Sequence, residues 1–110
     1  MTFLYMIEYK LVAGSYVPIG VWCVGKGGGL DVEIRMLPGY AEEQEAADWV
    51  INRLVENRVE HIGRQFLVYH QETLSPYRGL RSKIVETDKY PSREALFAEL
   101  LKQIQEGRLK

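Results

Sequence analysis

A stretch of glycines around one lysine, Gly25-Lys26-Gly27-Gly28-Gly29, has the composition of a phosphate-binding loop. Such loops follow the patterns GxxxxGK[ST] or GxGxxG and lead into a helix, whose N-terminal N–H groups hold the anion. Here no hydroxyl residue follows Lys26, the GxGxxG spacing is absent, and residues 30–36 alternate like a strand. We therefore predict a hairpin connection in which glycines supply positive φ. The alternative is a mobile flap from which Lys26 contacts an anion.

The segment 73–83, TLSPYRGLRSK, combines aromatic and basic side chains in a loop marked by proline and glycine. Its candidate binding residues are Tyr77, Arg78, Arg81 and Lys83. An aromatic ring can stack on a base while arginine and lysine pair with phosphate, so this loop is the strongest candidate for binding nucleic acid or a partner protein. The alternative is a solvated surface loop in which Tyr77 packs down as an anchor.

The sequence gives little support for a metal site or for a catalytic nucleophile. His61 and His70 lack the two further ligands that a zinc site needs, and no HxH, HExxH or CxxC motif is present. Cys23 is the only cysteine and lies in the most apolar run, which is typical of a buried, unreactive thiol. We expect no metal, no cofactor and no catalytic residue.

The elements that would position these residues begin with three strands. Residues 3–12 alternate with period two, residues 16–24 are apolar on both faces, and residues 30–36 alternate between core and water. Residues 66–70 resemble a fourth strand, and residues 82–87 a short fifth strand.

Two apolar stripes at helical spacing complete the pattern. One covers residues 41–62, with acidic residues in its first turn, and the other follows Ser92, a suitable N-cap. The order is β-β-β-α-β-(β)-α, which predicts one α+β domain over residues 1–110: a three-stranded antiparallel meander, a helix, one or two further strands and a C-terminal helix. We expect both helices on one face of the sheet.

Two segments resemble known families. Residues 3–24 are similar to the opening of an uncharacterised bacterial family with a Val-Gly-Val step, which implies no activity. Three strands, then Leu37-Pro38-Gly39-Tyr40 and an acidic helix start, are similar to small antitoxins with a partial ribonuclease-H-like fold. The DNA-binding tail usual in those antitoxins is not evident, and Glu8 is the only acid of the first strand, so metal-dependent nuclease activity is not carried over.

Charge and hydropathy exclude some classes of function. The net charge of −1 excludes a strongly basic nucleic-acid binder, although residues 1–60 carry −4 and residues 61–110 carry +3. Residues 1–10 lack the basic start of a signal peptide, and no apolar run reaches the ~18 residues that cross a membrane. We expect a cytoplasmic protein without membrane contact.

The leading functional hypothesis is a non-catalytic protein-binding or regulatory domain that self-associates as a homodimer. The first alternative is a nucleic-acid-binding protein that uses the loop 73–83. The second is a small enzyme that holds an anionic substrate with Lys26 and Arg78.

Overall fold

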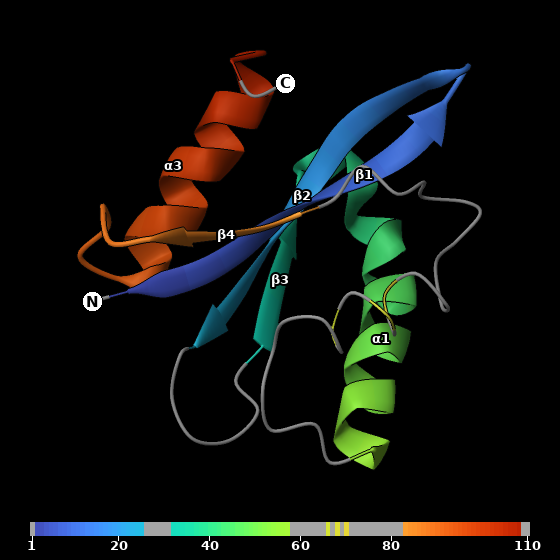
Figure 1. Cartoon of the computed structure of the whole chain (residues 1–110). Coiled ribbons are helices and arrows are strands. Elements are labelled where there is room, and N and C mark those ends of the chain that lie inside the picture. Colours follow the sequence, from blue (N-terminus) through green and yellow to red (C-terminus); the bar gives the residue numbers. More distant parts are fainter. Residues whose placement is uncertain are drawn as a thin grey trace.

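The computed structural model describes residues 2–25, 32–57 and 83–108, together with Phe66, Val68 and His70. Along the chain (Figure 1), its elements are β1 Phe3–Val12, β2 Ser15–Gly25, β3 Val32–Met36, the 3-10 helix η1 Pro38–Glu43, α1 Gln44–Glu56, β4 Ile84–Thr87 and α3 Arg93–Gln105.

The strands form one antiparallel sheet in the order β3-β2-β1-β4. This confirms the α+β class, the meander and the strand expected near residues 82–87. The strand expected at 66–70 is wrong, because Phe66, Val68 and His70 are helical. Phe66 and His70 are buried while Val68 is exposed, as expected for a helix, in which residues four apart share a face.

The two helices lie on opposite faces of the sheet (Figure 1), so the expectation that both cover one face is wrong. Helix α3 packs on the face that carries Ile7, Tyr9 and Cys23, whereas α1 packs on the face that carries Met6 and Trp22. The physical reason is already in the central strands, since β1 and β2 are apolar on both sides and each side must be covered.

Each helix forms for local reasons. In α3, the Ser92 hydroxyl accepts a hydrogen bond from the Ala95 N–H at 3.1 Å, which confirms the expected N-cap. In α1, Ala47, Val50 and Leu54 are buried on the apolar stripe. The helix expected over 41–62 begins with the 3-10 turn η1, and its described part ends at Glu56.

The β1–β2 hairpin is the longest paired unit of the sheet. Its register runs from Phe3↔Gly25 to Val12↔Ser15, with a bulge between Glu8 and Tyr9. A two-residue turn closes it, with positive φ at Ala13 (50°) and Gly14 (83°), as in a type I′ turn. The hairpin therefore extends well beyond the part of the sheet that β3 and β4 reach.

Candidate functional site

The exposed end of the β1–β2 hairpin, residues 11–16, is the strongest candidate surface, and we call it the hairpin tip. Strand β3 pairs with β2 only over Gly20–Val24, and β4 pairs with β1 only over Phe3–Met6. In the described ranges, neither strand reaches the tip. Its large apolar side chains keep much of their surface in solvent, with exposed fractions of 43% for Leu11, 41% for Val12 and 40% for Tyr16.

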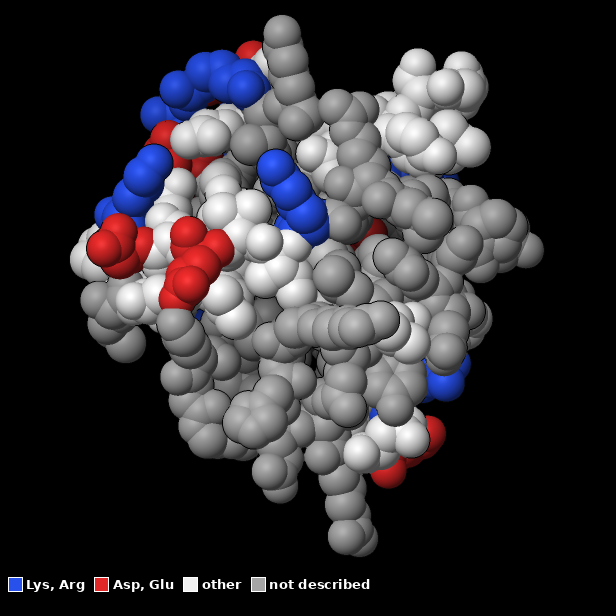
Figure 2. Space-filling view, in the orientation of Figure 1, with Lys and Arg blue, Asp and Glu red and all other residues white. Residues whose placement is uncertain are grey.

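Both faces of the hairpin tip carry apolar groups. Leu11 and Tyr16 are cross-strand partners, so their side chains project to the same face. Val12 projects to the opposite face, because side chains alternate along a strand. The tip contains no charged residue, and Figure 2 shows this end of the hairpin, at the upper right, without acidic or basic side chains.

The charged residue that precedes the hairpin tip in the sequence, Lys10, is neutralised within the chain. The ammonium group of Lys10, on the α1 side of β1, contacts the carboxylate of Glu43 in η1. This ion pair ties the base of the tip to the rest of the molecule. The tip is thus a positioned, uncharged and partly apolar surface, which can bind another surface but offers no acid–base or nucleophilic group beyond two hydroxyls.

A second polar cluster lies inside the protein. The carboxylate oxygens of Glu8 lie 2.9 and 3.2 Å from the His70 Nε2, and both side chains are buried. The Trp22 ring meets the Phe66 ring edge-to-face, with centroids 5.1 Å apart, and its Nε1 has no hydrogen-bond partner among the described residues. The cluster joins Phe66 and His70 to the sheet.

Sequence reasoning missed the pairing of Glu8 with His70. Glu8 follows Met6 on the face of β1 that contacts α1. An acidic residue at a core-facing position of a strand needs a buried partner, and this requirement could have predicted the pairing from the sequence. Among the described residues, no three histidine, cysteine or acidic side chains form a group that could hold a metal ion.

The edge strand β3 is fastened to α3 by charges. The Arg35 guanidinium donates to both carboxylate oxygens of Glu94, at 2.7 and 2.5 Å, and lies 4.6 Å from the centroid of the Phe97 ring. The hydrogen bond from Arg35 lowers the pKa of the Glu94 carboxyl below its ordinary value and raises the pKa of Arg35. The charge of Arg35 is therefore paired within the chain, where it links β3 to α3.

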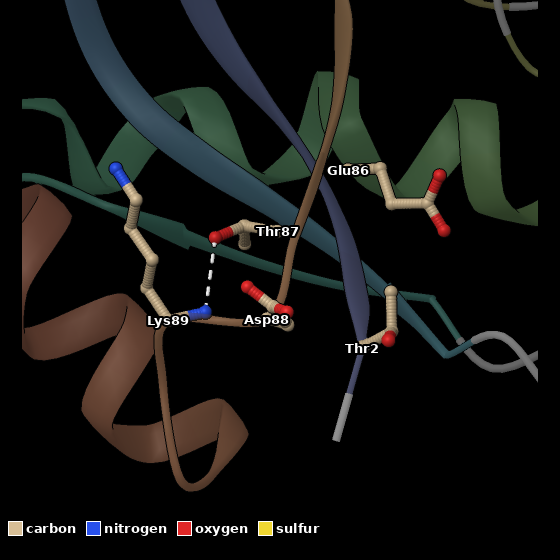
Figure 3. Close-up of a pocket in the computed structure, with 5 residues that line it drawn as sticks. All are labelled: Thr2, Glu86, Thr87, Asp88 and Lys89. Carbon is tan, nitrogen blue, oxygen red and sulfur yellow. Dashed lines mark hydrogen bonds between the residues drawn. The ribbon is translucent and has the colours of Figure 1, made fainter.

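A shallow pocket opens near the end of β4 (Figure 3), with a volume of about 370 Å³. It is lined by Thr2, Glu86, Thr87, Asp88 and Lys89. The Thr87 hydroxyl accepts a hydrogen bond from the Lys89 N–H at 3.3 Å, and the side chains of Glu86 and Lys89 point away from each other. The ionic groups of these residues do not converge on one point, so they form no binding or catalytic arrangement.

Only some of the residues proposed from the sequence are among the described residues. Lys26, Tyr77, Arg78 and Arg81 lie outside the described residues, and so does His61. Lys83 is exposed directly before β4. Cys23 is buried as expected, and Tyr9 lies in the core against α3.

Comparisons with known proteins add no function. No protein family, curated protein or solved structure matches this chain. In the part of the chain that the structure describes, no helix is both long enough and apolar enough to cross a membrane.

Proposed function

We propose that this protein is a small protein-binding domain that self-associates through its hairpin tip. The observation that carries the proposal is the exposure of Leu11, Val12 and Tyr16 on a hairpin that extends beyond its neighbouring strands. Exposed apolar side chains gathered on a positioned element are typical of protein interfaces, and tyrosine is enriched there.

A second copy of the chain is the partner that fits this surface. In a two-fold dimer the same patch meets itself, so a charged patch would meet its own charge. The hairpin tip is uncharged, and the adjacent Lys10 is paired with Glu43, so two tips meet without like-charge repulsion. The paired strands present Leu11 and Tyr16 side by side, which allows each copy to cover the other's apolar pair.

The expected affinity is modest. Three half-exposed side chains form a surface far smaller than the roughly 800 Å² per partner of a standard interface. We therefore expect a dissociation constant in a range of roughly micromolar to millimolar, which matches a reversible regulatory contact better than an obligate dimer.

The test is sedimentation equilibrium over a protein range of roughly 1 µM to 1 mM. The expected result is a mass that rises toward the dimer, with association weakened at least about tenfold in the double variant Leu11→Ser/Tyr16→Ser. Val55→Ser is the matched control, because Val55 is also an exposed apolar residue but lies on α1. A constant monomer mass, or equal effects of the two sets of substitutions, would overturn the proposal.

A further inference from the structure

The turn of the β1–β2 hairpin has an unusual sequence for its geometry. Ala13 and Gly14 form the turn, with φ of 50° and 83°, between the paired residues Val12 and Ser15. Two-residue turns of this type favour Asn-Gly or Asp-Gly, because both central residues need positive φ. Glycine meets that need freely, but the Cβ of an alanine in this region crowds the following carbonyl oxygen. Ala13 is therefore held in a strained backbone conformation.

The described part of the chain does not explain this strain. Ala13 and Gly14 are exposed, and in that part of the structure no heavy atom lies within 4 Å of a methyl group added at Gly14. Strained residues persist where their surroundings fix them, and they gather at functional sites. The methyl group of Ala13 also cannot form the local hydrogen bond by which asparagine or aspartate stabilises such a turn. A contact that favours alanine at this position must therefore come from outside the described chain.

The composition of the turn fits burial against another surface. Exposed turns are rich in Asn, Asp, Ser and Gly, whose polar groups are solvated by water. Here Ala13 and Gly14 continue the exposed apolar surface of the hairpin tip, which consists of Leu11, Val12 and Tyr16. An asparagine amide would lose its hydrogen bonds to water when a second copy covered the turn, whereas a methyl group gains from leaving water. Alanine is thus unfavourable in the free monomer and favourable in a contact that excludes water.

We infer that Ala13 and Gly14 lie inside the contact between two copies of the chain, and that Ala13 strengthens this contact while it lowers the stability of the monomer. Ala13 thereby adds a residue that sets the strength of the self-association proposed above, on which this inference rests. The surface that covers the turn is a second copy, because the hairpin tip is uncharged and can meet itself across a two-fold axis without repulsion.

The experiment compares wild type with Ala13→Asn by two measurements that are expected to change in opposite directions. Thermal unfolding at about 1 µM reports the monomer, because association at higher concentration would itself raise the midpoint. Ala13→Asn is expected to raise that midpoint by roughly 2 to 5 °C, since asparagine relieves the strain. Sedimentation equilibrium is expected to show that the same substitution weakens association at least about fivefold.

Two further variants separate a local contact from a general effect. Ala98→Asn makes the same change at an exposed alanine of α3 and is expected to leave association unchanged. Ala13→Asp also suits the turn, but it places like charges together in a two-fold contact. It is expected to weaken association more than Ala13→Asn does, and raising the salt concentration from about 50 mM to about 500 mM is expected to recover part of the loss.

The outcomes distinguish this inference from the proposed function. A wild-type chain that stays monomeric over the whole concentration range would overturn both. If the wild type associates and Ala13→Asn associates as tightly, only this inference is wrong, and the turn lies outside the contact. A midpoint that does not rise in Ala13→Asn would show that Ala13 is not strained in the monomer, which would overturn the inference as well.

Discussion

At the scale of single residues, Glu8 and His70 are two buried polar side chains, and each needs the other as its partner. Their side chains are 0% and 2% exposed and lie within 2.9 Å of each other, although 62 positions separate them in the chain. Removing one member of a buried polar pair leaves the other without a partner in a medium that cannot solvate it. The pair therefore stabilises the attachment of His70 to β1.

Substitution of either member tests this role. Glu8→Ala and His70→Ala are each expected to lower the free energy of unfolding by about 3 to 5 kcal/mol, measured by urea denaturation at neutral pH. The double variant is expected to lose clearly less than the two separate losses together, because each single change already removes the interaction. Glu45→Ala, on the exposed face of α1, is the control. Additive losses would show that the two residues act independently.

The raised pKa of Tyr5 predicts that the protein loses stability at alkaline pH. Burial raises the pKa of the Tyr5 phenol above its ordinary value near 10, and the neighbouring Tyr90 raises it further. The folded protein thus holds this proton more tightly than the unfolded chain, so stability is lost as pH rises from about 10 through the folded pKa. Urea denaturation at pH 9, 10 and 11 is expected to show a steeper decline in wild type than in Tyr5→Phe; equal declines would contradict it.

At the scale of elements, the contact between β2 and β3 depends on a residue without a side chain. Gly20 pairs with Met36, and a methyl group added there would lie 2.7 Å from the Met36 Sδ and 2.9 Å from the Arg35 carbonyl oxygen. The sulfur can move, but the carbonyl belongs to the strand backbone. The two strands must therefore separate to accept any larger residue.

Gly20→Ala is expected to destabilise the protein by about 1 to 3 kcal/mol, as overpacking of a filled interior does. The loss is measured by thermal unfolding. Gly39→Ala is the matched control, because no heavy atom lies within 4 Å of the added methyl group. Hydrogen exchange is expected to rise in β3 of the Gly20→Ala variant, and a variant as stable as wild type would contradict the close approach.

At the scale of the whole molecule, periodicity predicts most of the architecture. The alternation in residues 3–12 and 30–36, and the apolar stripe of residues 93–105, lead directly to β1, β3 and α3. The prediction that both helices cover one face is wrong, because β2 is apolar on both faces and each face is covered by one helix. The strand predicted at residues 66–70 is wrong, because a short apolar run fits the period of a helix as well as that of a strand.

The candidate surfaces can be predicted less well. Leu11, Val12 and Tyr16 have the sequence pattern of ordinary strand ends, since sequence alone cannot show that β3 and β4 stop short of them. A nucleic-acid role for Tyr77, Arg78, Arg81 and Lys83 stays a prediction.

Chemical crosslinking tests the contact between hairpin tips most directly. Ser15→Cys places a thiol in the turn region, while the native Cys23 is buried and stays unreactive in the folded protein. With a short bis-maleimide, Ser15→Cys is expected to give a covalent dimer, which is lost when Leu11→Ser and Tyr16→Ser are added. Asn52→Cys, exposed on α1, is expected to remain monomeric. If Ser15→Cys crosslinks no more than Asn52→Cys, the hairpin tip is not the self-association surface.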